Sequence, residues 1–170
     1  SKKYEQIMSK ALLLTSLDMH FFIEHNRGHH KNVSTPLDPA TSRLNQSIYS
    51  FFPRTIFGGW MSAWHLEAHR LKKMKQNFWN PIHNEMLRFQ IIQILFIVLI
   101  YAVFGWIGAV GFVASAVVGF LLLEVVNYIE HYGLERRQLP NGSYEKVKPH
   151  HSWNSGHELG RIFLFELTRH

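Results

Sequence analysis

A long stretch without charge dominates the hydrophobic pattern. No Asp, Glu, Lys or Arg occurs from Phe89 to Leu123. At about 1.5 Å per residue, these roughly 35 positions make a helix of about 52 Å, which is too long for one straight crossing of a hydrocarbon core about 30 Å thick. The sequence Gly105-Trp106-Ile107-Gly108 is the natural break. The pattern therefore predicts a transmembrane hairpin, with crossings at about 86–104 and 109–130.

A weaker apolar pattern precedes the hairpin. Apolar side chains recur at helical spacing over residues 4–24, which predicts a helix. Asp18 and His20 interrupt its apolar run, which is too short and too polar to cross a bilayer alone. The prolines and the aspartate of Thr35-Pro36-Leu37-Asp38-Pro39 predict loop and turn structure over residues 31–57.

A further helix is expected over about 56–75. It carries Trp60, Trp64 and a basic end, which predicts an amphipathic helix on the membrane surface. The predicted fold class is all-α: an integral membrane helical bundle fragment with one transmembrane hairpin and cytoplasmic His-rich helices. A hairpin buried in a soluble protein is the alternative, but a domain of 170 residues has little surface with which to cover it.

The charge distribution orients the predicted hairpin. The formal net charge is +6, and Lys and Arg are concentrated in the two segments that flank the apolar region. The positive-inside rule places both flanks, 24–85 and 131–170, on the cytoplasmic side. The basic residues form no unbroken patch with stacking aromatic residues, so no nucleic-acid partner is predicted. The chain has no cysteine, which excludes disulfides, iron–sulfur clusters and thiolate zinc sites.

The first candidate site is the segment Glu24-His25-Asn26-Arg27-Gly28-His29-His30. On a helix, His25 and His29 are one turn apart, with His30 beside them. Imidazole is the commonest metal ligand, and a cluster without cysteine favours iron, copper or zinc. The alternative is a basic helix end without bound metal.

The second candidate site closes the second predicted crossing. Asn127 and His131 are four positions apart on one helix face, and Glu124 lies one further turn back. Ionisable residues at such a helix end usually face the interior of the bundle and mark function, although snorkelling to the headgroups is the alternative. The hairpin topology places His131 at the same membrane level as the first site.

Two other histidine patterns are weaker. His65-Leu66-Glu67-Ala68-His69 carries its Glu one position later than the HExxH zinc motif requires, so the pair is predicted to lie on the polar face of a surface helix. His157-Glu158-Leu159-Gly160-Arg161 has Arg where the second His must stand, and Arg offers no lone pair to a metal.

These residues resemble the integral-membrane alkane 1-monooxygenases, the non-haem di-iron alkane ω-hydroxylases of the wider membrane fatty-acid desaturase and hydroxylase superfamily. The resemblance runs along essentially the whole chain, as a single partial domain over 1–170. Its segments are 24–30, Ser62-Ala63-Trp64, Asn127-Tyr128-Ile129-Glu130-His131-Tyr132-Gly133-Leu134, His151-Ser152-Trp153-Asn154-Ser155 and Phe165-Glu166-Leu167-Thr168-Arg169-His170.

The resemblance implies O2-dependent terminal hydroxylation of medium- to long-chain n-alkanes to 1-alkanols at two histidine-ligated iron ions, with electrons from rubredoxin. It implies a bacterial inner membrane location with the histidine boxes on the cytoplasmic side, in contact with membrane lipid. By carry-over, the residues that match iron ligands are His25, His29, His30, His131 and His170, and no catalytic residue is predicted beyond the metal site. Glu24 and Glu130 precede ligands and, with Asn127, are expected to orient neighbouring imidazoles.

The chain also departs from the family pattern. The family's first box, His-Glu-x-x-His, is expected before Ser1, and the rest of its last box, Ser-Asp-His-His, is expected after His170. The chain alone is therefore predicted to be inactive. Two alternatives stay open: a membrane fatty-acyl desaturase or hydroxylase, and a non-catalytic membrane fragment.

Overall fold

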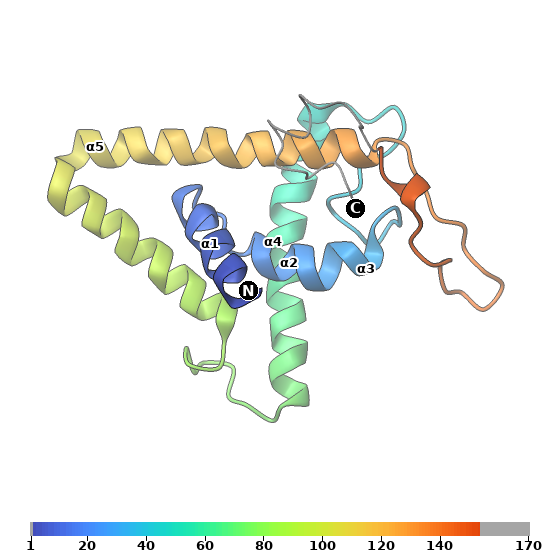
Figure 1. The fold of residues 1–170 in the computed structure, drawn as a ribbon, viewed down its shortest axis with the longest axis horizontal. Helices are drawn as coiled ribbons and strands as arrows, with labels where there is room; N and C mark the ends of the chain where they lie inside the picture. Colours follow the sequence, from blue (N-terminus) through green and yellow to red (C-terminus); the bar gives the residue numbers. More distant parts are fainter. Residues whose placement is uncertain (1, 154–170) are drawn as a thin grey trace.

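The computed structural model describes residues 2–153, and these residues form an all-helical fold (Figure 1). The helices, in chain order, are α1 (Lys2–Thr15), α2 (Phe21–Glu24), the π-helix η1 (His25–His29), α3 (His30–Asn32), α4 (Ile48–Lys73), α5 (Glu85–His131) and the 3-10 helix η2 (Pro149–His151). Within the described residues the only β pairing is an isolated bridge between Gln138 and Tyr144. The predicted all-α class is confirmed.

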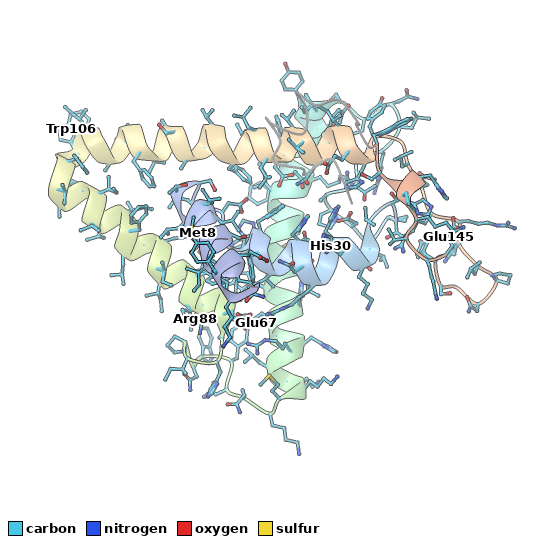
Figure 2. The ribbon with its side chains drawn as sticks, viewed as in Figure 1. Met8, His30, Glu67, Arg88, Trp106 and Glu145 are labelled. Atoms are coloured by element: carbon cyan, nitrogen blue, oxygen red, sulfur yellow. The ribbon has the colours of Figure 1, made fainter. Side chains whose placement is uncertain are left out.

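Helix α5 has a sharp bend at Gly105. The backbone there has φ 70° and ψ −173°, a region that essentially only glycine adopts, so two helical arms meet at this residue. At about 1.5 Å per residue the arms are about 30 Å and about 39 Å long. Figure 2 shows Trp106 at the tip of the bend. The sequence Gly105-Trp106-Ile107-Gly108 therefore marks the break, as its two glycines indicate.

The surface of α5 is apolar. Among the described residues, it is the one helix that is long and apolar enough to cross a membrane, and none of its most apolar window is buried. Large apolar side chains exposed along both arms include Ile94, Leu95, Val98, Leu99, Phe104, Trp106, Val117 and Leu122. Exposure of this much apolar surface fits a helical membrane protein.

The helix predicted over 4–24 is interrupted. Helix α1 ends at Thr15, and Leu17 adopts φ 54°, which a helix cannot accommodate. The buried Met19 N–H then donates to the Gln93 Oε1 atom of α5 over 2.8 Å. The prediction of one helix is therefore wrong at this break. The N–H groups of Leu17 and Asp18 bond back to the last turn of α1, and only the Met19 N–H takes a tertiary partner. Figure 1 shows α1 between the two arms of α5.

Helix α4 begins earlier than its sequence indicates. The Ser47 hydroxyl accepts from Ser50 N and caps the helix, so residues 48–57 are helical although Pro53 lies among them. The loop predicted over 31–57 is therefore wrong for its last third. The core joins α4 to α2 and α5 through Met19, Ile23, Ala63, Met86 and Phe89.

A buried carboxylate ties the histidine-rich segment to the bundle. Glu67 of α4 is fully buried and accepts from Arg27 Nη1 over 2.9 Å, from Arg70 and from the Glu85 backbone N–H at the start of α5. Arg27 also pairs with Glu85. The segment that carries His25, His29 and His30 is thus held against both long helices. Figure 2 labels Glu67 on α4.

Candidate metal centre

The first histidine segment forms a π-helix instead of the predicted α-helix. The His30 N–H donates to the His25 carbonyl, which is the i→i+5 bond of a π turn. The wider turn brings His30 under His25: their ring centroids are 4.3 Å apart, against 5.3 Å between His25 and His29. Single π turns recur at functional sites. Here the turn carries three imidazoles whose ring centroids lie 4.3–6.1 Å apart.

The second histidine segment meets the first. The ring of His131, at the end of α5, lies 4.7 Å from the ring of His29, centroid to centroid. Both residues are buried. The structure thus brings His25, His29, His30 and His131 into one cluster, from two segments that are far apart in the sequence.

His29 is oriented by a carboxylate. Its Nδ1 lies 2.9 Å from Asp38 Oδ2, and both side chains are buried. Burial raises the pKa of Asp38, but the hydrogen bond and charge of His29, with hydrogen bonds from Thr41 and Ala40, outweigh it and lower the pKa. Because a carboxylate only accepts, His29 Nδ1 donates this hydrogen bond, and the neutral imidazole therefore has its lone pair on Nε2.

His131 is oriented in the same way by a backbone carbonyl. Its Nδ1 lies 3.3 Å from the carbonyl oxygen of His151 in η2. A carbonyl accepts and cannot donate, so Nδ1 again carries the proton and Nε2 the lone pair. This is the tautomer in which metal-ligating histidines are normally held. The donor set therefore fits a nitrogen-ligated metal ion.

Three polar residues predicted to orient imidazoles are buried beside this cluster. They are Glu24, Asn127 and Glu130. Burial raises the pKa of Glu24 to about 8, with the charge of Asp38 as the next cause, and Glu24 Oε1 has no hydrogen-bond partner among the described residues. Asn127 Nδ2 donates to Glu124 Oε2 over 3.3 Å, and Thr55 donates to the same oxygen. The orienting roles of all three residues stay predictions.

The other histidine patterns contribute no ligand to the cluster. His65 and His69 are exposed on α4, which agrees with the predicted polar face. His157, with the motif that begins there, and the predicted ligand His170 lie outside the described residues.

A separate cluster has the composition of a cation site. Donor atoms of Glu145, His150 and His151 lie within 4.8 Å of one another. However, His151 Nδ1 accepts the Lys148 N–H over 2.9 Å, so Nε2 carries the proton and faces Glu145 Oε1 at 3.4 Å. Lys148 Nζ is 3.1 Å from Glu145 Oε2. These partners already neutralise the carboxylate and leave the imidazole of His151 no lone pair for a cation. Figure 2 labels Glu145 in the loop before η2.

Sequence reasoning missed the groups that hold the two central imidazoles. The sequence indicates Asp38 only as a turn former, because only the folded loop brings its carboxylate to His29. The carbonyl of His151 carries no signal of its own, because any residue supplies one.

Comparisons with known proteins identify the family of this chain. The sequence model of the family described as "Fatty acid desaturase" matches residues 5–170. Alkane 1-monooxygenase 1 of Alcanivorax borkumensis is 44% identical over 167 residues, covering 98% of this chain and 41% of the relative. Alkane 1-monooxygenase 2 of Pseudomonas aeruginosa is 46% identical over 168 residues, covering 98% and 44%.

A third relative, alkane 1-monooxygenase of Ectopseudomonas oleovorans, is 44% identical over 167 residues and covers the same shares as the first. The chain thus spans less than half the length of these curated relatives. The resemblance to alkane 1-monooxygenases is confirmed. Since the family model matches nearly all of the chain, the protein belongs to the fatty acid desaturase family.

Proposed function

We propose that this chain is part of an O2-dependent monooxygenase that hydroxylates the terminal carbon of medium- to long-chain n-alkanes. The observation that carries the proposal is the meeting of His29 and His131, whose ring centroids are 4.7 Å apart although they come from separate motifs. The alignments with alkane 1-monooxygenases cover 98% of the chain, which supports an alkane as the substrate class.

The metal ions in this proposal are two non-haem irons. His25, His29, His30 and His131 would hold them, and His170 would join by resemblance. A terminal C–H bond offers no charge to polarise, so acid–base residues cannot break it, and the reduced iron pair supplies the O2 chemistry when bound. The chain itself buries the imidazoles of His29 and His131 and holds both in the same tautomer.

The proposed topology has two crossings, at about 86–104 and 109–130. The exposed apolar surface of both arms of α5 and the bend at Gly105 support it. The flanks 24–85 and 131–170 then lie on the cytoplasmic side of the bacterial inner membrane, and lipid covers α5.

Electrons are proposed to come from rubredoxin on the cytoplasmic face. Exposed basic residues suited to steering an acidic partner are Lys72, Lys73 and Arg137. Replacing all three with Glu is expected to slow electron transfer at low salt and to lose its effect at high salt. Unaltered rates at low salt would remove the support for this docking surface.

The proposal is tested in the full-length protein that carries this sequence. His131→Ala is expected to lower the iron content and abolish conversion of octane to 1-octanol, whereas His65→Ala, which changes an exposed histidine outside the cluster, is expected to leave both unchanged. Equal iron content in the two variants would contradict the proposed site.

A fatty-acyl substrate is the second candidate, favoured by the match to the fatty acid desaturase family. Product analysis with octane and with an acyl substrate separates the two. Formation of desaturated or hydroxylated acyl product without 1-octanol would replace the alkane proposal. For the isolated chain, less than one bound iron and no turnover would support a non-catalytic fragment.

A further inference from the structure

A chain of buried hydrogen bonds begins at His29. Its Nδ1–H donates to Asp38 Oδ2 over 2.9 Å, and the Thr41 hydroxyl donates to the same oxygen over 2.5 Å. Ala40 N donates to the other carboxylate oxygen over 3.0 Å. Asp38 is 1% exposed, so each of these bonds is made away from water. The carboxylate is therefore fixed from three directions.

The path of hydrogen bonds continues from Thr41 to Ser34. The Ser34 backbone N–H donates to Thr41 Oγ1 over 2.8 Å. The hydroxyl of Thr41 is thus a donor to Asp38 and an acceptor from Ser34, and both of these uses require its oxygen in one place. Thr41 contacts neither His29 nor His131 through a hydrogen bond in this arrangement.

Ser34 joins the two histidine-bearing segments. Its Oγ donates to the His151 carbonyl over 2.9 Å, and its own carbonyl accepts from Arg136 N over 2.7 Å. Its φ is 57°, a left-handed conformation that is unfavourable for a non-glycine residue. This conformation allows Ser34 to bond through its N–H, its carbonyl and its side chain at the same time.

The path of hydrogen bonds ends at His131. The His151 carbonyl that accepts from Ser34 also accepts from His131 Nδ1 over 3.3 Å. We infer that Asp38, Thr41, Ser34 and the His151 carbonyl form one positioning unit that fixes the tautomer and the mutual orientation of His29 and His131. The inference rests on the proposed role of these two histidines as metal ligands.

These residues are expected to act as one unit because they are buried. Every side chain in the path is nearly inaccessible to water. A buried hydrogen bond that is broken in one place leaves polar groups without partners, so the members of such a network act together. Loss of the Thr41 hydroxyl, which touches neither imidazole, should therefore be felt at both.

Thr41→Val is the decisive variant, since it replaces the hydroxyl by a methyl group of similar volume. Thr41→Ser restores the hydroxyl. Thr35→Val is the matched control: Thr35 is buried in the same loop, and among the described residues its hydroxyl bonds to Asn32 and Leu37, which lie outside the unit. All three are made in the full-length protein, with anaerobic Co2+ titration and the visible spectrum of bound Co2+ as readouts.

Thr41→Val is expected to weaken Co2+ binding by about 10–100-fold and to alter the Co2+ spectrum, as loss of groups that orient ligands does. Thr41→Ser is expected to restore the wild-type affinity and spectrum, and Thr35→Val to change neither. If Thr41→Val and Thr35→Val bind Co2+ equally, with the same spectrum, the inference is overturned.

A double-mutant cycle tests the connection itself. Asp38→Asn acts beside His29, and Ser34→Gly removes the hydroxyl beside the His151 carbonyl while keeping the left-handed backbone favourable. In one unit the two effects on Co2+ affinity are expected to be smaller together than their sum, and strict additivity would contradict a single unit.

His29→Ala separates this inference from the proposed function. If His29→Ala leaves Co2+ stoichiometry unchanged, the proposed metal centre is wrong. If His29→Ala abolishes binding while Thr41→Val matches Thr35→Val, the metal centre stands and the positioning unit alone is wrong.

Discussion

Arg27, which lies inside the histidine-rich π turn, donates to the fully buried carboxylate of Glu67 over 2.9 Å. The same carboxylate accepts from Arg70 and from the backbone of Glu85. One acidic side chain thus connects the histidine segment, α4 and the start of α5. Both the stability of the bundle and the position of His25, His29 and His30 should therefore depend on Glu67.

Glu67→Gln is expected to lower the free energy of unfolding by roughly 2–4 kcal/mol, because it removes a buried charge that three donors share. Thermal unfolding in detergent measures the effect. Glu135→Gln, at an exposed glutamate, is the control and is expected to have no measurable effect. Equal unfolding midpoints for the two variants would show that the Arg27 and Arg70 pairs add nothing to stability.

The same carboxylate makes stability sensitive to acid. Burial raises the pKa of Glu67, but the hydrogen bond from Arg70, the backbone N–H of Glu85 and the two arginine charges outweigh it, so its pKa lies below the ordinary 4.5. The stabilisation is therefore complete above pH 4.5 and is lost as the pH falls through the lower, folded-state pKa. Unfolding midpoints of the wild type and Glu67→Gln, measured from pH 7 downward, should converge below pH 4.5. A constant gap between them would contradict this assignment.

Gly105 and Gly111 give a matched test of the bend in α5. An added Cβ meets nothing within 4 Å at either position, so only the backbone conformation differs. Gly105→Ala is expected to cost about 1–3 kcal/mol, because its backbone angles suit essentially glycine alone. Gly111→Ala lies in regular helix and is expected to be neutral or stabilising by up to about 1 kcal/mol. Unfolding midpoints measured in detergent compare the two variants. If Gly105→Ala leaves the midpoint unchanged, the glycine backbone conformation at the bend does not contribute to stability.

The proposed topology can be mapped by cysteine labelling, since the chain has no cysteine of its own. A membrane-impermeant maleimide added to intact cells, after access through the outer membrane, is expected to label Trp106→Cys at the bend. Lys146→Cys, in the loop before η2, is expected to react only after the inner membrane is opened. Labelling of both residues in intact cells would rule out a hairpin with cytoplasmic flanks.

Glu130 is expected to support the metal centre. It is buried next to His131, so Glu130→Ala should lower the iron content or the activity of the full-length protein. Glu135→Ala, at an exposed glutamate, is the control. Unchanged iron content and unchanged activity in Glu130→Ala would remove this role.

The sequence was sufficient for the features that depend on composition and local spacing. The uncharged stretch and its glycines indicated both α5 and its bend at Gly105, because hydrophobicity and backbone freedom are local properties. The two histidine segments were also recognisable from residue type. Their meeting through His29 and His131 agrees with the membrane level that the predicted hairpin assigns to both.

Features set by tertiary contacts were not predictable in the same way. After the break at Thr15, the Met19 N–H bonds to Gln93, which is far away in the sequence. Asp38 read as a turn residue because its partner, His29, is fixed only by the folded loop. The early start of α4 was hidden by Pro53, whose usual effect is to end a helix.

The π turn makes the spacing of the first histidines sensitive to insertion and deletion. Such a turn holds one residue more than the α turn that it replaces. Removing one residue from it, such as the exposed Asn26, would restore α-helical bonding and rotate the residues after it by about 100° about the helix axis. Every histidine would remain in the sequence, yet the set would no longer converge. A sequence alignment that opens a gap inside 25–29 therefore matches histidines that do not occupy equivalent places.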